Sequence, residues 1–244
     1  MILFVTGTGT GIGKTVVAAA LASCATGSVA VVKPAQTGVA PGEPADLAEV
    51  AVMSGCPDGH EFARYPDPLS PHHAAAISGL PELDLDDVVD RIGALADERD
   101  LVLVEGSGGL LVPFTRDGWT LLDLATELGG RIVLVTAAGL GTLSHTAAAL
   151  QVLRTEDLGD ADIVIGSWPR EPGLAERCNA ADLARRCGVA DLLAPAGLGG
   201  AVPADAVYAE DFPALARAAL APRLGGTFDS DAFVAQWAPP HVRE

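Results

Sequence analysis

Long apolar runs and clustered positive charge are both missing from this sequence of 244 residues. No apolar run approaches the length of a transmembrane helix, and no basic segment precedes the first apolar stretch, so we expect neither a membrane span nor a secretory signal. The formal net charge is −17 with no dense basic run, which argues against a nucleic-acid surface. The expected setting is therefore the cytoplasm, without nucleic-acid or membrane partners.

Cysteine is present but has no informative spacing. No C-x-x-C pair occurs among Cys24, Cys56, Cys178 and Cys187. This arrangement favours isolated thiols in a reducing compartment over a disulfide framework or a zinc site.

Lysine is the scarcest charged residue, because only Lys14 and Lys33 among the 15 basic residues are lysines. Arginine cannot replace lysine where a compact ammonium must enter a phosphate-lined pocket. Each lysine also lies beside a predicted strand. We therefore predict that both lysines border a functional site rather than an ordinary surface.

Short apolar runs alternate with helical patterns along the chain. Strands are predicted at 2–6, 28–32, 100–104, 131–136 and 162–166, with a weaker one at 190–194. Helices are predicted at 14–25, 44–54, 84–98, 120–128, 142–156, 174–187 and 211–220. The strands lack polar alternation, as in a parallel sheet covered on both faces. The predicted fold class is α/β, doubly wound and mostly parallel, with helices on both faces and the site at the carboxyl ends of the strands.

Two segments do not follow this alternation. Residues 55–82 are rich in Pro, Gly and His and are predicted to be irregular, with a short helix at 71–79. Residues 1–221 are predicted to form a single domain and 222–244 a tail that packs on the body or on a neighbouring subunit. The tail carries Phe228, Phe233 and Trp237 near helical spacing.

Residues 7–15 read GTGTGIGKT between a predicted strand and a predicted helix. This order forms a phosphate cradle of inward-facing N–H groups, to which the helix adds the positive end of its dipole. Lys14 would reach the β- and γ-phosphates and Thr15 would ligate Mg²⁺. The hydroxyl of Thr10 either faces the transferred phosphoryl group or is structural. The residues predicted to contact the nucleotide here are Gly9, Gly11, Ile12, Gly13, Lys14, Thr15 and Val16.

Two further strand ends carry charged residues. Lys33 follows the second predicted strand, where its ammonium would stabilise negative charge in the same pocket unless it is simply solvated. Glu105 follows an apolar strand, in the position of a Mg²⁺-binding carboxylate, and glycines follow it. Asp46 reads equally well as a second metal ligand or as an acid at a helix N-terminus.

Weaker candidates lie in two other segments. Residues 139–145, GLGTLSH, open a helix whose free N–H groups would bind an anion or simply be capped. His72 and His73 are adjacent without a third ligand, which favours surface residues over a metal site. No Ser-His-Asp arrangement is readable.

Together these motifs resemble the dethiobiotin synthetase family. That family's P-loop is one residue longer than the usual pattern and reads GTxTxxGKT, which residues 7–15 match throughout. The stretches KPxxTG at 33–38, EGxGG at 105–109, LGxxxH at 140–145 and PG at 172–173, with Asp46 between the first two, keep the family order. The resemblance spans residues 2 to about 175 and implies a P-loop NTPase-like fold.

The resemblance implies a ligase that closes a cyclic urea from 7,8-diaminopelargonate (7,8-diaminononanoate), CO₂ and ATP, with Mg²⁺, in biotin biosynthesis. It assigns catalytic roles to Thr10, Lys14 and Lys33, and metal ligation to Thr15, Asp46 and Glu105, of which Glu105 also borders the nucleotide. It also implies a homodimer. In this dimer the helix start at 141–145 receives the carboxylate of the substrate that is bound to the other subunit. The implied substrate-binding residues are Thr10, Lys33, Thr37, Gly108, Gly141, Thr142, Leu143 and Ser144.

Two departures and two alternatives accompany this interpretation. Gly11 stands where many members have an acidic residue, and Ser167 stands where members place an asparagine that reads adenine. A serine makes fewer directed hydrogen bonds, which weakens the expectation of ATP over other nucleotides. The alternatives are another P-loop ATPase, of the cobyrinate-amidating or partition type, and a nucleotide-binding regulatory module without catalysis.

Overall fold

The computed structural model describes residues 1–158, 161–185 and 198–242. In these residues all seven strands pair in parallel in one sheet, in the order β3-β2-β4-β1-β5-β6-β7. The strands are β1 (Ile2–Gly7), β2 (Val29–Thr37), β3 (Gly59–Tyr65), β4 (Leu101–Glu105), β5 (Arg131–Thr136), β6 (Asp162–Trp168) and β7 (Gly200–Pro203). The five stronger predicted strands are confirmed, and the weaker one at 190–194 lies outside the described residues.

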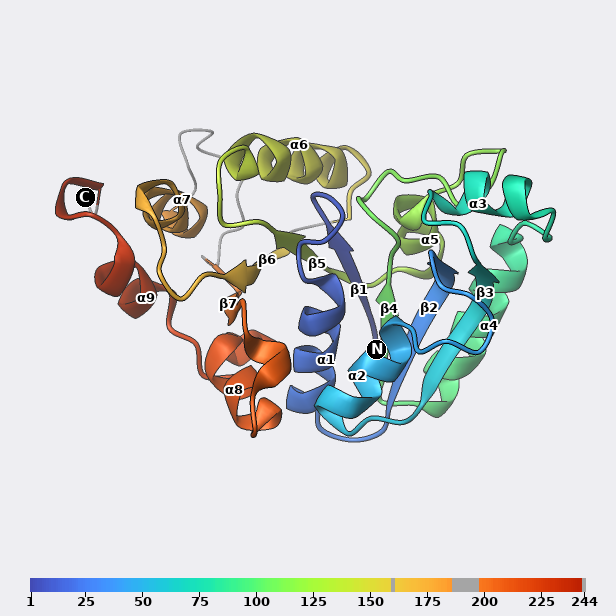
Figure 1. Ribbon diagram of the computed structural model, residues 1–244, viewed down its shortest axis with the longest axis horizontal. Helices are drawn as coiled ribbons and strands as arrows, with labels where there is room; N and C mark the ends of the chain where they lie inside the picture. Colours follow the sequence, from blue (N-terminus) through green and yellow to red (C-terminus); the bar gives the residue numbers. More distant parts are fainter. Residues whose placement is uncertain (159–160, 186–197, 243–244) are drawn as a thin grey trace.

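Helices cover both faces of the sheet (Figure 1). They are α1 (Lys14–Cys24), α2 (Asp46–Ser54), α3 (Pro71–Ser78), α4 (Leu85–Glu98), α5 (Leu121–Leu128), α6 (Thr142–Thr155), α7 (Leu174–Arg185), α8 (Phe212–Ala219) and α9 (Ser230–Trp237), with short 3₁₀ turns η1 (Ala206–Tyr208), η2 (Pro222–Leu224) and η3 (Pro240–Val242). One apolar core joins the sheet to α1, α2 and α8, a second joins it to α3 through α7, and a small third cluster joins α7 to α9. The predicted α/β class is therefore confirmed, and so is the short helix at 71–79.

The prediction of an irregular segment at 55–82 is wrong at β3. This strand reads GHEFARY, lies at the sheet edge and keeps most of its side chains half-exposed, so it has no apolar run. Its pairing also lengthens β2 past the predicted end at residue 32, since Lys33 pairs with Glu61 and Thr37 with Tyr65. Lys33 therefore lies inside a strand rather than after one.

The last α-helix of the described residues, α9, packs on the body of the molecule. The Trp168 ring lies 4.9 Å from the Phe233 ring and 5.8 Å from the Trp237 ring between centroids, both edge-to-face. The Arg177 side chain donates a 2.8 Å hydrogen bond to the Trp237 carbonyl. The division into a domain at 1–221 and a tail stays a prediction. Within the described residues, no helix combines the length and the apolar character that a bilayer crossing needs.

The strand order brings the predicted motifs to one edge of the sheet. β1 lies between β4 and β5, and Val5 is opposite Glu105. The loop after β1 and the carboxyl end of β4 therefore lie side by side, and β2 lies on the other side of β4. Ligands of such sheets bind at the carboxyl ends of the strands, near the point where the strand order reverses.

Candidate active site

The loop between β1 and α1 is curled tightly against β6. Gly11 and Gly13 have φ values of +70° and +93°, which side chains other than glycine rarely adopt. A Cβ added at Gly13 would lie 2.2 Å from the Gly166 carbonyl oxygen, so the backbone of β6 leaves no room for one. The buried Lys14 Nζ donates a 2.9 Å hydrogen bond to the Gly9 carbonyl across the loop. Burial lowers the pKa of Lys14, and the nearby Glu105 charge opposes this effect.

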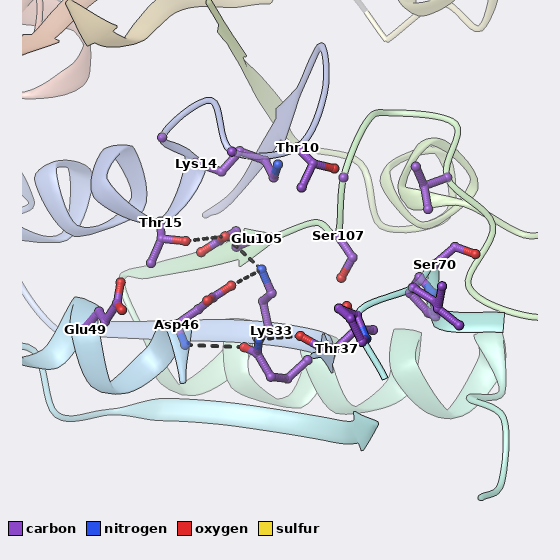
Figure 2. Close-up of a pocket in the computed structure, with 18 of the residues that line it drawn as sticks. Thr10, Lys14, Thr15, Lys33, Thr37, Asp46, Glu49, Ser70, Glu105 and Ser107 are labelled. Carbon is purple, nitrogen blue, oxygen red and sulfur yellow. Dashed lines mark hydrogen bonds and ion pairs between the residues drawn. The ribbon is translucent and has the colours of Figure 1, made fainter. Parts of the chain in front are cut away.

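A compact cluster of charges lies beside this loop. Lys33 Nζ is 2.6 Å from Asp46 Oδ2 and 2.8 Å from Glu105 Oε1, and Thr15 Oγ1 donates a 3.0 Å hydrogen bond to the same Glu105 oxygen. Figure 2 shows these four side chains turned toward one another from β2, α1, α2 and β4. Burial by itself lowers the pKa of Lys33, but the charges of Glu105 and Asp46 outweigh it and hold that pKa above its usual value.

The donor set of the cluster suits Mg²⁺. Thr15, Asp46 and Glu105 offer a hydroxyl and two carboxylates, the oxygen ligands that this ion prefers. The Glu105 side chain is only 1% exposed, and its Oε2 has no hydrogen-bond partner among the described residues. A buried carboxylate oxygen without a partner is costly, and a bound cation would satisfy it. The described residues hold no group of three or more His, Cys, Asp or Glu side chains placed for a metal, so phosphate and water oxygens would complete the coordination.

A cavity of about 610 Å³ opens between the loop and the cluster. The predicted site residues that line it are Thr10, Gly11, Gly13, Lys14, Thr15, Val16, Lys33, Thr37, Asp46, Glu105 and Gly108. Six of these come from residues 10–16 alone, and the others come from β2, from α2, and from the end of β4 and the loop after it. The structure therefore gathers most of the predicted residues around one space. Gly9 and Ile12 belong to the same loop without lining the cavity.

The other predicted residues lie away from this cavity. Gly141, Thr142, Leu143 and Ser144 begin α6, where Gly141 and Ser144 are exposed. The Thr142 hydroxyl is buried and lies 2.5 Å from the Thr136 hydroxyl. Ser167 is exposed on β6, directly after Gly166, against which the loop between β1 and α1 (residues 8–13, here called the phosphate loop) packs. The contacts that these five residues make with ligands stay predictions.

The paired histidines have structural partners. His72 Nδ1 lies 3.3 Å from the Pro113 carbonyl, and His73 Nδ1 lies 3.3 Å from Ser70 Oγ. Their rings are 3.9 Å apart between centroids. Both are at the start of α3, whose first residue Pro71 lines the cavity together with the preceding residues 68–70.

Sequence reasoning missed several cavity residues. Pro68 to Pro71 follow β3, which the sequence did not indicate, and Glu49 lies one turn beyond Asp46 on α2. Gln36 had a readable signal, because it lies in the same stretch as Lys33. Its buried amide accepts a hydrogen bond from the Asp46 N–H at 3.4 Å and donates to the Thr37 carbonyl at 3.2 Å.

Comparison with known proteins gives a consistent result. A family model described as an AAA domain matches residues 2–195. The ATP-dependent dethiobiotin synthetase of Frankia casuarinae is 52% identical over 96% of this chain and 98% of its own length. The chain belongs to the dethiobiotin synthetase family. The enzyme of that name from Streptomyces avermitilis is 49% identical over 98% of this chain and 99% of its own length. The one from Rhodococcus jostii is 60% identical over 75% of this chain and 80% of its own length.

The loop between β1 and α1 closes in spite of its unusual spacing. Gly7 lies one residue further from Gly-Lys-Thr than in the usual pattern. The loop nevertheless closes, since Lys14 Nζ reaches the Gly9 carbonyl and the Thr8 N–H donates a 3.0 Å hydrogen bond to the Val135 carbonyl of β5. The unusual position of Gly7 is thus compatible with a complete strand-loop-helix cradle.

Proposed function

We propose that this protein catalyses ATP-dependent ring closure of 7,8-diaminopelargonate with CO₂ to dethiobiotin, ADP and phosphate, in biotin biosynthesis. The dethiobiotin synthetase relatives support this reaction, since two of them align over almost the entire chain. The observation that carries it in this chain is the cluster in which Lys33 lies within 2.8 Å of both Asp46 and Glu105, next to the phosphate loop.

The reaction needs the protein to position the reactants and to neutralise negative charge. One amine of the substrate takes up CO₂ as a carbamate, whose oxygen attacks the γ-phosphate and displaces ADP to give a carbamic-phosphoric anhydride. The second amine then closes the ring and releases phosphate. Such phosphoryl transfer depends on positioning and on neutralisation of charge rather than on covalent chemistry by the protein. A cavity lined by two buried lysines, Lys14 and Lys33, supplies both.

Each residue has a place in this scheme. The loop N–H groups and Lys14 hold the triphosphate, and Thr10, Lys33 and Thr37 contact the carbamate and the transferred phosphoryl group. Thr15, Asp46 and Glu105 would hold Mg²⁺, which when bound supplies countercharge to the phosphate oxygens. Lines of support are the cavity that these residues share and the unpartnered oxygen of Glu105.

The proposal includes a homodimer working in the cytoplasm. The N–H groups at the start of α6 would receive the carboxylate of substrate bound to the other subunit, through Gly141, Thr142, Leu143 and Ser144. The exposure of Gly141 and Ser144 away from the cavity of the same chain is compatible with such a role.

The deciding experiment measures inorganic phosphate released from ATP, Mg²⁺ and bicarbonate, with and without 7,8-diaminopelargonate. We expect release to require the diamine and dethiobiotin to form in equal amount. Release that ignores the diamine would point instead to a P-loop ATPase of another specificity. Nucleotide binding without any release would point to a regulatory module.

Nucleotide preference gives a separate prediction at Ser167. A serine offers one hydroxyl where an asparagine offers directed amide donors and acceptors to a base. We expect the wild-type protein to use ATP, CTP and GTP with kcat/KM values within about tenfold of one another, and Ser167→Asn to favour ATP by a further factor of about ten, the scale of one directed hydrogen bond. Steady-state kinetics with the three nucleotides measures both values. An unchanged ratio in the variant would place base recognition elsewhere.

A further inference from the structure

Lys33 is saturated by groups of the protein itself. Its ammonium has three N–H donors, and three oxygens surround it: Asp46 Oδ2 at 2.6 Å, Glu105 Oε1 at 2.8 Å and the Gly106 carbonyl at 3.4 Å. The side chain is only 5% exposed. In this arrangement the ammonium has no donor left for a ligand in the cavity.

The same two carboxylates are the ones that would hold Mg²⁺. Glu105 Oε1 already accepts from both Lys33 and Thr15, and Asp46 Oδ2 is the oxygen nearest to Lys33. A divalent cation on these oxygens would lie within a few ångströms of the ammonium, and two positive charges at such a distance in a buried site repel strongly. Glu105 Oε2 is open to a cation, but the metal and the ammonium therefore compete for the same two carboxylates.

We propose that Lys33 is the resident counter-cation of the metal site, and that a divalent metal ion displaces its ammonium from Asp46 and Glu105 into the cavity. Without metal, Lys33 keeps the two buried carboxylates paired, which they need because unpaired charges are costly to bury. With metal, the ammonium becomes available to an anion in the cavity, which Lys33 already lines. Its flexible four-carbon stem allows this movement.

The inference deepens the proposed function, since it makes the availability of Lys33 to the reacting anion depend on metal. The exchange itself requires neither ATP nor the diamine. A test on the metal alone can therefore fail while the synthetase reaction stands, and the exchange can hold in an ATPase of another specificity.

The test uses Mn²⁺ as the probe and counts free Mn²⁺ by electron paramagnetic resonance, with no nucleotide or diamine present. Lys33→Met removes the competing ammonium, and Lys14→Met is the matched control. This control variant also deletes one positive charge from the cavity. The Lys14 ammonium that it removes donates to the Gly9 carbonyl rather than to a carboxylate. We expect Lys33→Met to bind Mn²⁺ about tenfold or more tightly than wild type, and Lys14→Met to stay within about threefold, as direct contact outweighs a more distant charge.

Three outcomes overturn the inference: equal affinity in wild type and Lys33→Met, an equal gain in both variants, and no binding by any of the three proteins. If Lys33→Met does not fold, the wild type supplies the answer through chemical labelling. The chain has only two lysines, so reductive dimethylation read by mass spectrometry reports on each separately. We expect Mg²⁺ to increase modification of Lys33 several-fold relative to Lys14, because Lys33 leaves its buried pairing. Modification that stays the same or falls would refute the exchange.

Discussion

Replacing Lys33 with Met lowers kcat for diamine-dependent phosphate release by about 10²- to 10³-fold, the cost of removing one preorganised donor from developing negative charge. The ammonium lies 2.6 Å from Asp46 Oδ2 and 2.8 Å from Glu105 Oε1, and it lines the same cavity as the loop after β1. Its loss removes charge from the transition state, and so kcat falls more than the affinity for nucleotide. Rapid-quench measurement of phosphate release at saturating ATP gives the number.

The control for this variant is the binding of nucleotide itself. Lys14 and the loop glycines are untouched, so the dissociation constant for ATP at fixed Mg²⁺ should change by less than the loss in kcat. Lys33→Arg should not restore activity, because the buried position that holds a compact ammonium does not suit the larger planar guanidinium. A Lys33→Met enzyme that keeps more than a tenth of wild-type kcat would reduce Lys33 to a structural ion pair.

The buried part of the sheet could be predicted from sequence, and its edges could not. β1, β4, β5 and β6 lie inside the sheet and are covered on both faces, so each contains an unbroken apolar run. β3 has only one neighbour, and its Glu61 and Arg64 pair with each other at 2.7 Å instead of facing a core. A strand stabilised by one neighbour and by polar side chains leaves no periodic signal.

The site residues on buried strands could also be predicted from sequence, whereas a contact that depends on the edge strand could not. Lys14, Lys33 and Glu105 could be found because each combines a rare or charged residue with a predicted strand. The close pairing of Asp46 with Lys33 could not, since it depends on the loop before α2. Arg64 holds that loop by donating to the Glu43 carbonyl at 2.8 Å and the Ala40 carbonyl at 3.3 Å. Arg64 belongs to β3, so the missed strand is also the reason that this contact was missed.

Gly13→Ala should abolish measurable ATP binding, with a loss of at least about a hundredfold, and should also destabilise the fold. The added Cβ would lie 2.2 Å from the Gly166 carbonyl oxygen and 2.7 Å from the Gly166 carbonyl carbon, both backbone atoms of β6. Neither atom can move away as a flexible side chain would, so the loop itself must shift. Because the loop N–H groups bind phosphate only when they converge, a displaced loop loses several hydrogen bonds together. Calorimetric titration with ATP and thermal unfolding measure the two effects.

Gly11→Ala separates backbone strain from this contact. Gly11 also has a positive φ, +70° against +93° for Gly13, but a Cβ there meets nothing within 4 Å. Its substitution therefore carries only the conformational cost, about 1 kcal/mol for an alanine in the left-handed region. We expect Gly11→Ala to weaken ATP binding by about tenfold or less. If the two variants lose equal affinity, the left-handed backbone alone sets the loop. If Gly13→Ala loses far more affinity for ATP than Gly11→Ala, the packing of the loop against β6 sets the loop conformation. The backbone of Gly166, which precedes Ser167, is then part of the nucleotide site.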